Sequence, residues 1–324
     1  MTYDKENMLD KLNNFRKQIE EAFKIAKKAK LPKIKKNKIS NIVVCGMGGS
    51  SAGGLLIKSF VKKIPVFVIR NYELPKYVNK NSLVFTVSYS GNTEETLSAY
   101  KEAKKRKATV IAVSSNGKLA EKEKKKCILI PSGYQPRIAL AYTFIPILVV
   151  LSRYRLIANQ DNALRETIRG LVPKTNSKEG FMLAKKLLNK TPIFYASDNL
   201  HGVVYICKTL TNENAKQPAF YHVFPEMNHN EINGFKKNAK KLYIVMIRDK
   251  KDHIRIKKRM EIVGKLLKES VGISELPTKG KSLLARMLHT LHIIMYTSYY
   301  LALMNKIDPT PVPIIQELKA KLKK

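Results

Sequence analysis

Two clusters of hydroxyl residues, each placed after an apolar run, could bind a phosphate group. The run 42–45 ends in glycines followed by Ser50, and the run 82–87 ends in Ser88, Ser90 and Thr93. Glycine lets the backbone approach a ligand closely, and the start of a helix favours an anion. Because the second cluster adds hydroxyl and amide donors to the first, the pair predicts a phosphate-monoester site at one edge of a sheet. The predicted binding residues are Gly49, Ser50, Ser88, Ser90 and Thr93.

The glycine-rich stretch 46–54 differs from two common nucleotide-binding loops. A dinucleotide fingerprint has glycine where this chain has Ser51, and an acidic residue where the next strand ends in Arg70. A P-loop needs a Gly-Lys-Ser/Thr sequence, which does not follow here. Taken alone, the first stretch suits a structural turn almost as well as a ligand site, and the second suits a helix N-cap. The presence of both is what favours a phosphate monoester.

Strand-like runs alternate with helix-like segments along the chain. A buried strand is predicted where a short apolar run ends in small or turn residues. Such runs lie at residues 42–45, 65–69, 82–87, 109–113, 127–130, 191–196 and 242–247. Strands separated by helices form parallel sheets with right-handed crossovers, so the pattern predicts an α/β fold.

The α/β pattern occurs twice, which predicts two doubly wound subdomains, each a parallel sheet flanked by helices. We expect an amphipathic helix over about residues 8–29 to open the first half, and a polar connector at 173–176 to lie within the second. Pro311 or Pro313 is expected to begin a terminal helix. The predicted subdomains are residues 1–155 and 156–324.

The composition bounds the partners of the protein. The chain has 324 residues, 44% of them apolar, and a net charge of +36. Its lysines are spread along the chain, whereas a nucleic-acid binder needs a basic face with stacking aromatic residues or a known motif. We therefore expect no specific nucleic-acid partner, and a charge that steers anionic substrates inward.

The cysteines and the apolar segments bound the compartment. Cys45, Cys127 and Cys207 share no close spacing, which fits free thiols in a reducing cytosol. The first residues contain no apolar core of a signal peptide. The most apolar run, 138–151, is short and contains Pro146, so it predicts a buried helix rather than a membrane span. We expect a cytoplasmic protein without a membrane partner.

Several stretches resemble one known family. The loops Gly46–Ser50 and Ser88–Thr96 are similar to those of the sugar isomerase (SIS) domain, and more narrowly to bifunctional phosphoglucose/phosphomannose isomerases of archaeal type. The likeness continues through the segments 131–137, 212–216, 224–231 and 308–319. It implies two SIS-type subdomains, a homodimer, a sugar 6-phosphate substrate, and aldose–ketose isomerisation with no metal and no cofactor.

The resemblance also implies roles for individual residues. Glu213 matches the family base, which moves a proton between two substrate carbons of an enediolate intermediate. His229 matches a histidine that opens the sugar ring and reaches the site from the partner subunit. Arg137 would stabilise the developing oxyanion, and Lys319 matches a lysine near the sugar ring. Without the motifs around them, a solvated carboxylate, a loop histidine and a surface lysine would explain these residues as well.

The substrate range and two alternatives stay open at this point. Counting back from Lys319 places Val312 where the family has a small threonine that leaves room for both epimers, so mannose 6-phosphate activity is less secure than glucose 6-phosphate activity. A non-catalytic SIS regulator would keep the serine loops but would not need Glu213, Arg137 and His229 together. A metal site could use His222, Glu226, His229 and Glu231, but their spacing matches no strong signature.

Overall fold

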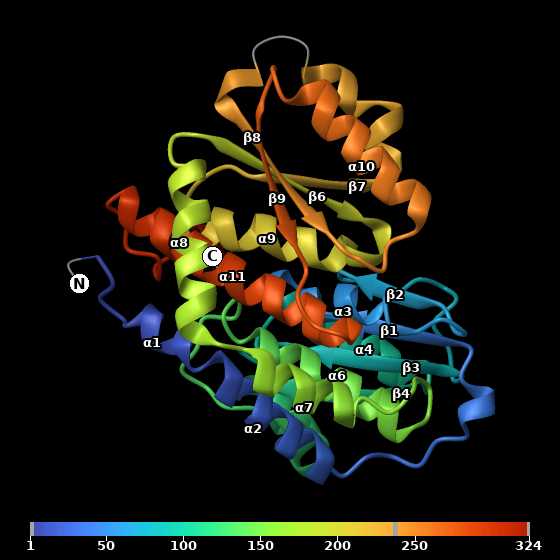
Figure 1. Ribbon diagram of the computed structural model, residues 1–324. Coiled ribbons are helices and arrows are strands. Elements are labelled where there is room, and N and C mark those ends of the chain that lie inside the picture. Colours follow the sequence, from blue (N-terminus) through green and yellow to red (C-terminus); the bar gives the residue numbers. More distant parts are fainter. Residues whose placement is uncertain (1–2, 236–238, 323–324) are drawn as a thin grey trace.

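Two parallel β-sheets, each flanked by helices, organise the computed structural model, which describes residues 3–235 and 239–322 (Figure 1). The first sheet has the strand order β2-β1-β3-β4-β5 and the second has the order β7-β6-β8-β9, and every neighbouring pair is parallel. The first sheet consists of β1 (Asn41–Cys45), β2 (Val66–Ile69), β3 (Ser82–Val87), β4 (Thr109–Ser114) and β5 (Ile128–Leu129). The second consists of β6 (Thr191–Ser197), β7 (Phe220–Phe224), β8 (Leu242–Arg248) and β9 (Gly272–Pro277).

The two sheets share one topology. In each, the chain places its second strand on one side of the first strand and its third strand on the other side. This reversal creates a switch point between β1 and β3 and another between β6 and β8, and open α/β sheets bind ligands at such points. The predicted α/β fold with two doubly wound sheets is confirmed. The two predicted phosphate loops follow β1 and β3.

Helices cover both faces of the sheets. The first half contributes α1 (Met8–Asn13), α2 (Phe15–Lys28), α3 (Gly48–Ile57), α4 (Glu94–Lys105), α5 (Gly117–Glu123) and α6 (Leu140–Arg153). The second half contributes α7 (Asp161–Gly170), α8 (Pro173–Leu187), α9 (His201–Asn214), α10 (Ile254–Leu267), α11 (Leu283–Met304) and α12 (Pro313–Lys321). β1 and β3 are buried throughout, as expected for central strands covered on both faces.

α3 and α9 lie against each other between the sheets (Figure 1). Gly202, near the start of α9, meets the end of α3: a Cβ on Gly202 would lie 2.8 Å from the Leu55 carbonyl carbon and 2.8 Å from the Leu56 nitrogen. The absence of a side chain therefore lets the two helix backbones touch. The opposite ends of these helices carry the candidate site described below.

Two edge strands, β7 and β9, escaped the prediction from sequence. Both are largely unburied: three of the five β7 residues are half-buried, and β9 has a single buried residue, Leu276. His222 interrupts the apolar residues of β7, and Ser274 and Glu275 interrupt those of β9, so neither segment has the continuous apolar run that marks the central strands.

Two helix boundaries also differ from the expectation. The opening helix is interrupted at Asn14, which separates α1 from α2. The expected polar connector at 173–176 is the first turn of α8, with Pro173 at its start. Asn176 is buried there, and its Nδ2 finds a hydrogen-bond partner in His292 Nδ1 at 3.0 Å. The predicted terminal helix begins at Pro313.

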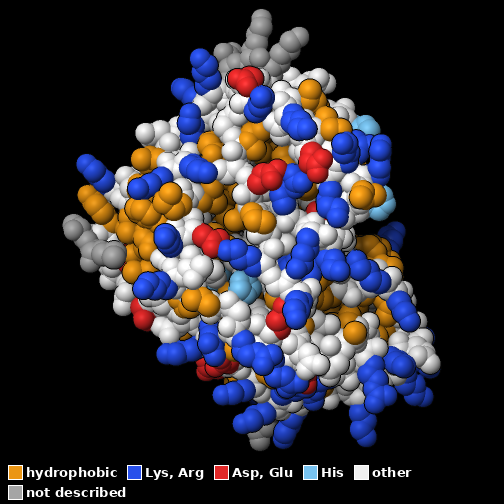
Figure 2. All heavy atoms as spheres, in the orientation of Figure 1, with side chains coloured by type: hydrophobic (Ala, Val, Ile, Leu, Met, Phe, Trp, Pro, Cys, Tyr) orange, Lys and Arg blue, Asp and Glu red, His pale blue; other side chains and the backbone are white. Residues whose placement is uncertain are grey.

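One buried apolar cluster runs between the two sheets, from Met8 in α1 to Ala302 in α11. The division of the chain at residue 155 therefore stays a prediction. Lys and Arg side chains are distributed over the face seen in Figure 2 rather than gathered in one patch. Within the described part of the chain, the helices are too short or too polar to cross a membrane.

Candidate functional site

The two hydroxyl loops meet at the carboxyl edge of the first sheet. β1 and β3 are direct neighbours, with Cys45 opposite Thr86. The Tyr89 backbone N–H donates to Ser50 Oγ over 3.2 Å, so the second loop is bonded to the first. Ser50 is buried, and its own hydroxyl hydrogen remains available to a ligand.

The end of β4 supports the second loop, residues 88–93, through a hydrogen bond. Ser114 Oγ donates to the Ser88 carbonyl over 2.7 Å, and Ser88 Oγ donates to Thr93 Oγ1 over 3.0 Å. Gly91 has a φ of +69°, and a Cβ there would lie 1.7 Å from the Asn116 carbonyl oxygen. Thr93 accepts from Ser88 and keeps its hydroxyl hydrogen, so the loop presents a rigid donor.

A backbone contact joins the first loop to Arg137. A Cβ on Gly49 would lie 2.7 Å from the Pro136 carbonyl oxygen and 2.9 Å from the Arg137 nitrogen. No side chain fits in this space, so the start of α3 lies directly against the segment that carries Arg137. The phosphate loops and the guanidinium are thereby fixed relative to each other.

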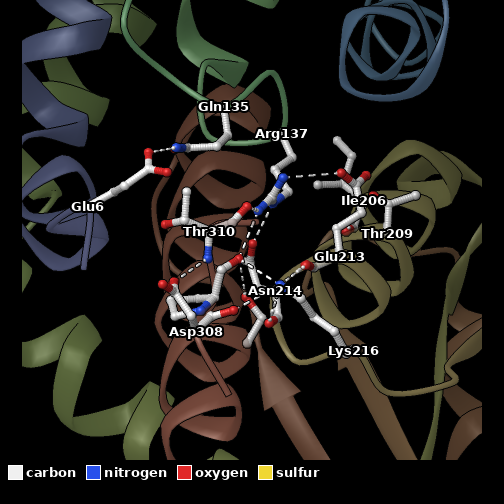
Figure 3. Close-up of polar contacts among 12 residues, drawn as sticks. Glu6, Gln135, Arg137, Ile206, Thr209, Glu213, Asn214, Lys216, Asp308 and Thr310 are labelled. Carbon is white, nitrogen blue, oxygen red and sulfur yellow. Dashed lines mark hydrogen bonds and ion pairs between the residues drawn. The ribbon is translucent and has the colours of Figure 1, made fainter. Parts of the chain in front are cut away.

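Arg137 is buried, with 5% of its surface exposed, and it is bonded on three sides (Figure 3). Its Nε donates to Asn214 Oδ1 over 2.5 Å, and its Nη2 donates to the Pro309 and Thr310 carbonyls over 2.8 Å each. Its Nη1 lies 3.4 Å from Glu213 Oε2. Burial lowers the pKa of Arg137, and the Glu213 carboxylate acts in the opposite direction.

Glu213 stands at the end of α9, beside this guanidinium. Its side chain is 25% exposed, so the carboxylate faces both Arg137 and solvent. The neighbouring Asn214 is buried and donates from Nδ2 to Ser298 Oγ over 2.9 Å, which fixes the last turn of α9 against α11. An accessible base next to an immobilised cation can remove a proton from carbon and stabilise the resulting oxyanion.

Arg70, which argued against a dinucleotide site, has structural partners. Its Nε donates to Ser51 Oγ over 3.1 Å, and its guanidinium lies 4.4 Å from the ring centroid of Tyr205. These contacts attach the end of β2 to α3 and α9.

His229 lies away from this group within one chain. It is exposed in the short 3₁₀ helix Glu226–His229, which follows the carboxyl end of β7. Helix α9 ends five residues before β7 begins, so Glu213 and His229 lie at opposite ends of that strand. Lys319 is exposed on α12, which buries none of its residues. In the described part of the chain, no hydrogen bond or ion pair joins Glu213 to His229 or to Lys319.

Two of the possible metal ligands lie close to each other, and one of these, Glu231, is also bonded to a tyrosine. His222 Nδ1 lies 3.8 Å from Glu231 Oε2, and the Tyr195 hydroxyl donates to Glu231 Oε1 over 2.9 Å. In the described residues, no group of three or more histidine, cysteine, aspartate or glutamate side chains is arranged to hold a metal ion.

Two surface cavities lie elsewhere on the molecule. One of about 640 Å³ is lined by residues around α4, including Tyr72 and Arg106, and one of about 190 Å³ is lined by Lys58, Ser59 and His201 among others. Neither cavity is lined by a residue of the two loops, by Arg137 or by Glu213.

Comparison with known proteins identifies the family. The sequence profile of the bacterial phosphoglucose isomerase C-terminal SIS domain matches residues 176–322, and that of the SIS domain matches residues 33–154. The bifunctional phosphoglucose/phosphomannose isomerase of Caldicellulosiruptor bescii is 42% identical over 97% of this chain and 98% of its own length. This chain belongs to the bifunctional phosphoglucose/phosphomannose isomerase family.

Other similarities to this family member are weaker. The D-glucosamine-6-phosphate 4-epimerase of Sulfolobus acidocaldarius is 34% identical over 59% of the chain and 62% of its own length. The C-terminal domain of glucosamine-fructose-6-phosphate aminotransferase from Francisella tularensis superposes with a TM-score of 0.73, covering 93% of this chain and 97% of that one. At 15% identity, this structural likeness shows the fold alone.

The structure of this phosphoglucose/phosphomannose isomerase family member joins most of the predicted site residues. The residues brought together are Gly49, Ser50, Ser88, Ser90, Thr93, Arg137 and Glu213. The prediction missed what holds them: Asn214, Lys216 and the carbonyls of Pro309 and Thr310. The first two lie in a stretch that resembles the family, but a backbone carbonyl leaves no signal in a sequence.

Proposed function

We propose that the protein reversibly isomerises glucose 6-phosphate and fructose 6-phosphate, and also accepts mannose 6-phosphate, through an enediolate and without a metal. The observation that carries this proposal is the fixed pair of Arg137 and Glu213, placed beside two loops rich in hydroxyl groups. Membership of the isomerase family supports the same reaction class.

The phosphate would bind at the switch point between β1 and β3. Ser50 and Thr93 each accept one hydrogen bond from the protein and retain a hydroxyl hydrogen for the ligand. Ser90 likewise accepts from the Asn92 backbone N–H, and its exposed hydroxyl completes the set. The start of α3 adds favourable electrostatics for an anion.

The isomerisation step itself moves one proton between neighbouring carbons. The Glu213 carboxylate takes the proton from C2 of the open-chain aldose, and the C–H electrons form the C1–C2 double bond while the carbonyl oxygen becomes an oxyanion. Return of that proton to C1, with transfer of the hydroxyl proton from O2 to O1, gives the ketose. Four of the five Arg137 N–H groups have protein acceptors, and the remaining one, on Nη1, is suited to the oxyanion.

Ring opening would require a second subunit. In our proposal His229 of one chain approaches the Glu213 site of its partner in a homodimer, takes the O1 proton and protonates the ring oxygen. The exposed position of His229, at the far end of β7 from Glu213, supports a contribution to another chain rather than to its own. We place Lys319 near the sugar ring in the same assembly, and the protein in the cytoplasm, where its three unpaired cysteines would stay reduced.

The use of both epimers follows from a shared intermediate. Glucose and mannose 6-phosphate give one enediolate once the C2 proton has left, so the second activity needs room for rotation about the adjacent bond. Val312, just before α12, stands where the family resemblance places a small threonine. Valine is of similar size and would leave the same room, but it lacks the hydroxyl group.

A coupled assay tests the proposal. We expect production of fructose 6-phosphate from glucose 6-phosphate and from mannose 6-phosphate, unchanged by a chelator. Glucosamine 6-phosphate, followed for epimerisation at C4, tests the activity named for the Sulfolobus relative. Absence of turnover on both hexose phosphates would refute the isomerase assignment, and loss of turnover with chelator would refute the absence of a metal.

A further inference from the structure

Lys216 binds four backbone carbonyls beside the candidate site (Figure 3). Its Nζ lies 2.9 Å from the backbone carbonyl oxygen of Glu213 and 3.3 Å from that of Asn214, which are the last two carbonyls of α9. It also lies 3.0 Å from the carbonyls of Asp308 and Pro309. The side chain therefore caps the helix that carries Glu213 and binds the segment that precedes α12.

The Pro309 carbonyl joins Lys216 to Arg137. It accepts from Lys216 Nζ over 3.0 Å and from Arg137 Nη2 over 2.8 Å. A carbonyl oxygen has two lone pairs, so both donors can be accommodated. The guanidinium and the backbone of Glu213 are thus attached to the same peptide group from two directions.

We propose that Lys216 is a positioning residue of the isomerase site, whose ammonium group holds the end of α9 against the 308–309 segment and so fixes the Glu213 carboxylate relative to Arg137. The inference rests on the proposed isomerase function. Lys216 touches backbone rather than reacting atoms, so its effect passes through Glu213 and Arg137.

The surroundings of Lys216 make this clamp sensitive to pH. Burial, with a further contribution from Arg137, lowers the pKa of Lys216 to about 8, while Asp308 and Glu213 raise it. An ammonium group has three N–H donors for the four carbonyls, and the neutral amine has two. The clamp should therefore weaken as the pH rises through about 8.

A comparison of three variants tests the inference. Lys216→Met removes the donors and Lys216→Arg keeps a cation that stays charged. Lys306→Met is the matched control, because Lys306 is also a lysine with a left-handed φ, of 59° against 51° for Lys216, and has no side-chain bond to a described residue. We expect Lys216→Met to lower kcat by about 10- to 100-fold with KM nearly unchanged, since the phosphate loops are intact, and Lys306→Met to match the wild type.

The pH profile provides a readout that a loss of stability would not move. The wild-type kcat/KM should fall above a pH of about 8, and Lys216→Arg should restore activity and remove that fall. Calorimetry with 5-phosphoarabinonate, whose carboxylate resembles the enediolate, should show weaker binding to Lys216→Met, whereas inorganic phosphate should bind as in the wild type.

The outcomes separate this inference from the proposed function. If the wild type isomerises hexose phosphates and Lys216→Met retains its kcat, or if Lys216→Arg keeps the fall near pH 8, the positioning role is wrong and the isomerase assignment stands. If the wild type has no turnover, the proposed function is wrong and the inference falls with it.

Discussion

Arg137 has structural contacts on most of its donor groups, and the proposed reaction would use the one that is left. Its Nε and Nη2 groups bind an amide and two carbonyls, which leaves Nη1 for Glu213 and for a substrate. A buried guanidinium bound on so many sides has little freedom to rotate, so its charge need not be reoriented when an oxyanion forms. A lysine could not replace it, because an ammonium lacks the planar fork.

Removal of the proposed base tests the role of a single residue. Glu213→Gln keeps the size of the side chain and abolishes its basicity, so we expect kcat to fall by about 10²- to 10⁴-fold. Substrate affinity, measured by calorimetry with glucose 6-phosphate, should change little because the serine loops are untouched. A variant with kcat within a few-fold of the wild type would show that another group removes the proton.

Gly49 offers a test of the contact between α3 and the Arg137 segment. In Gly49→Ala the new methyl group would lie 2.7 Å from the Pro136 carbonyl oxygen, so backbone must move. We expect a rise in KM for glucose 6-phosphate and a loss of about 1–3 kcal/mol in the free energy of unfolding. Gly264→Ala is the control, because no atom lies within 4 Å of that Cβ, and a helical alanine should stabilise by about 0.5–1 kcal/mol. Equal kinetics in the two variants would contradict the proposed contact.

At the scale of elements, one buried histidine links three helices. His292 in α11 accepts from Asn176 of α8 at Nδ1 over 3.0 Å, and its Nε2 donates to the Leu12 carbonyl of α1 over 3.0 Å. Burial lowers the pKa of His292 to about 4, with a smaller opposing effect of the Leu12 carbonyl. The neutral imidazole is therefore the form that the folded chain requires.

This arrangement predicts acid sensitivity between these helices. An unfolded histidine titrates at about 6.5, above the folded value, so the unfolded chain binds the proton first and stability falls as the pH drops from about 6.5 to about 4. The contribution is complete above about pH 6.5, and we expect a loss of about 2 kcal/mol between pH 7.5 and pH 5. Urea unfolding of the wild type and of His292→Asn at several pH values measures it. If the free energy of unfolding of His292→Asn falls with decreasing pH as steeply as that of the wild type, the acid sensitivity belongs to other groups.

The elements also show which features a sequence reveals. Continuous apolar runs predict central strands such as β1 and β3, and the serine loops are recognisable because they follow those runs. The edge strands β7 and β9 lack such runs because polar residues interrupt them, His222 in β7 and Ser274 and Glu275 in β9. The sequence predicts a polar connector at Asn176, because its buried partner His292 is distant in the chain. The clamp around Arg137 and Lys216 depends on carbonyls, which every residue possesses.

At the scale of the whole molecule, the two sheets present their carboxyl ends for different uses. The edge of the first sheet carries the hydroxyl loops, and the edge of the second carries the exposed segment with His229. Since His229 lies at the far end of β7 from Glu213, a two-fold dimer is the simplest way to combine them.

A mixing experiment distinguishes the proposed dimer with shared sites from subunits whose sites are independent. Co-expression of Glu213→Gln and His229→Ala chains, each inactive alone on the ring form, should yield mixed dimers in which one site has an intact Glu213 and an intact His229 of the partner subunit. Random pairing then restores about a quarter of the wild-type activity. Mixed dimers purified with two different tags and found inactive would exclude a shared site.

The contacts of α3 limit how this protein could change during evolution. The start of the helix touches the backbone at Pro136 and Arg137 through Gly49, and its end touches Gly202 at Leu55 and Leu56. Even a methyl group at either glycine would displace main chain, so we expect substitutions there to cost stability before they can alter specificity. New substrate preferences should therefore arise more readily at exposed positions, such as Pro311 before α12 and the surface around His229, where replacements cost less.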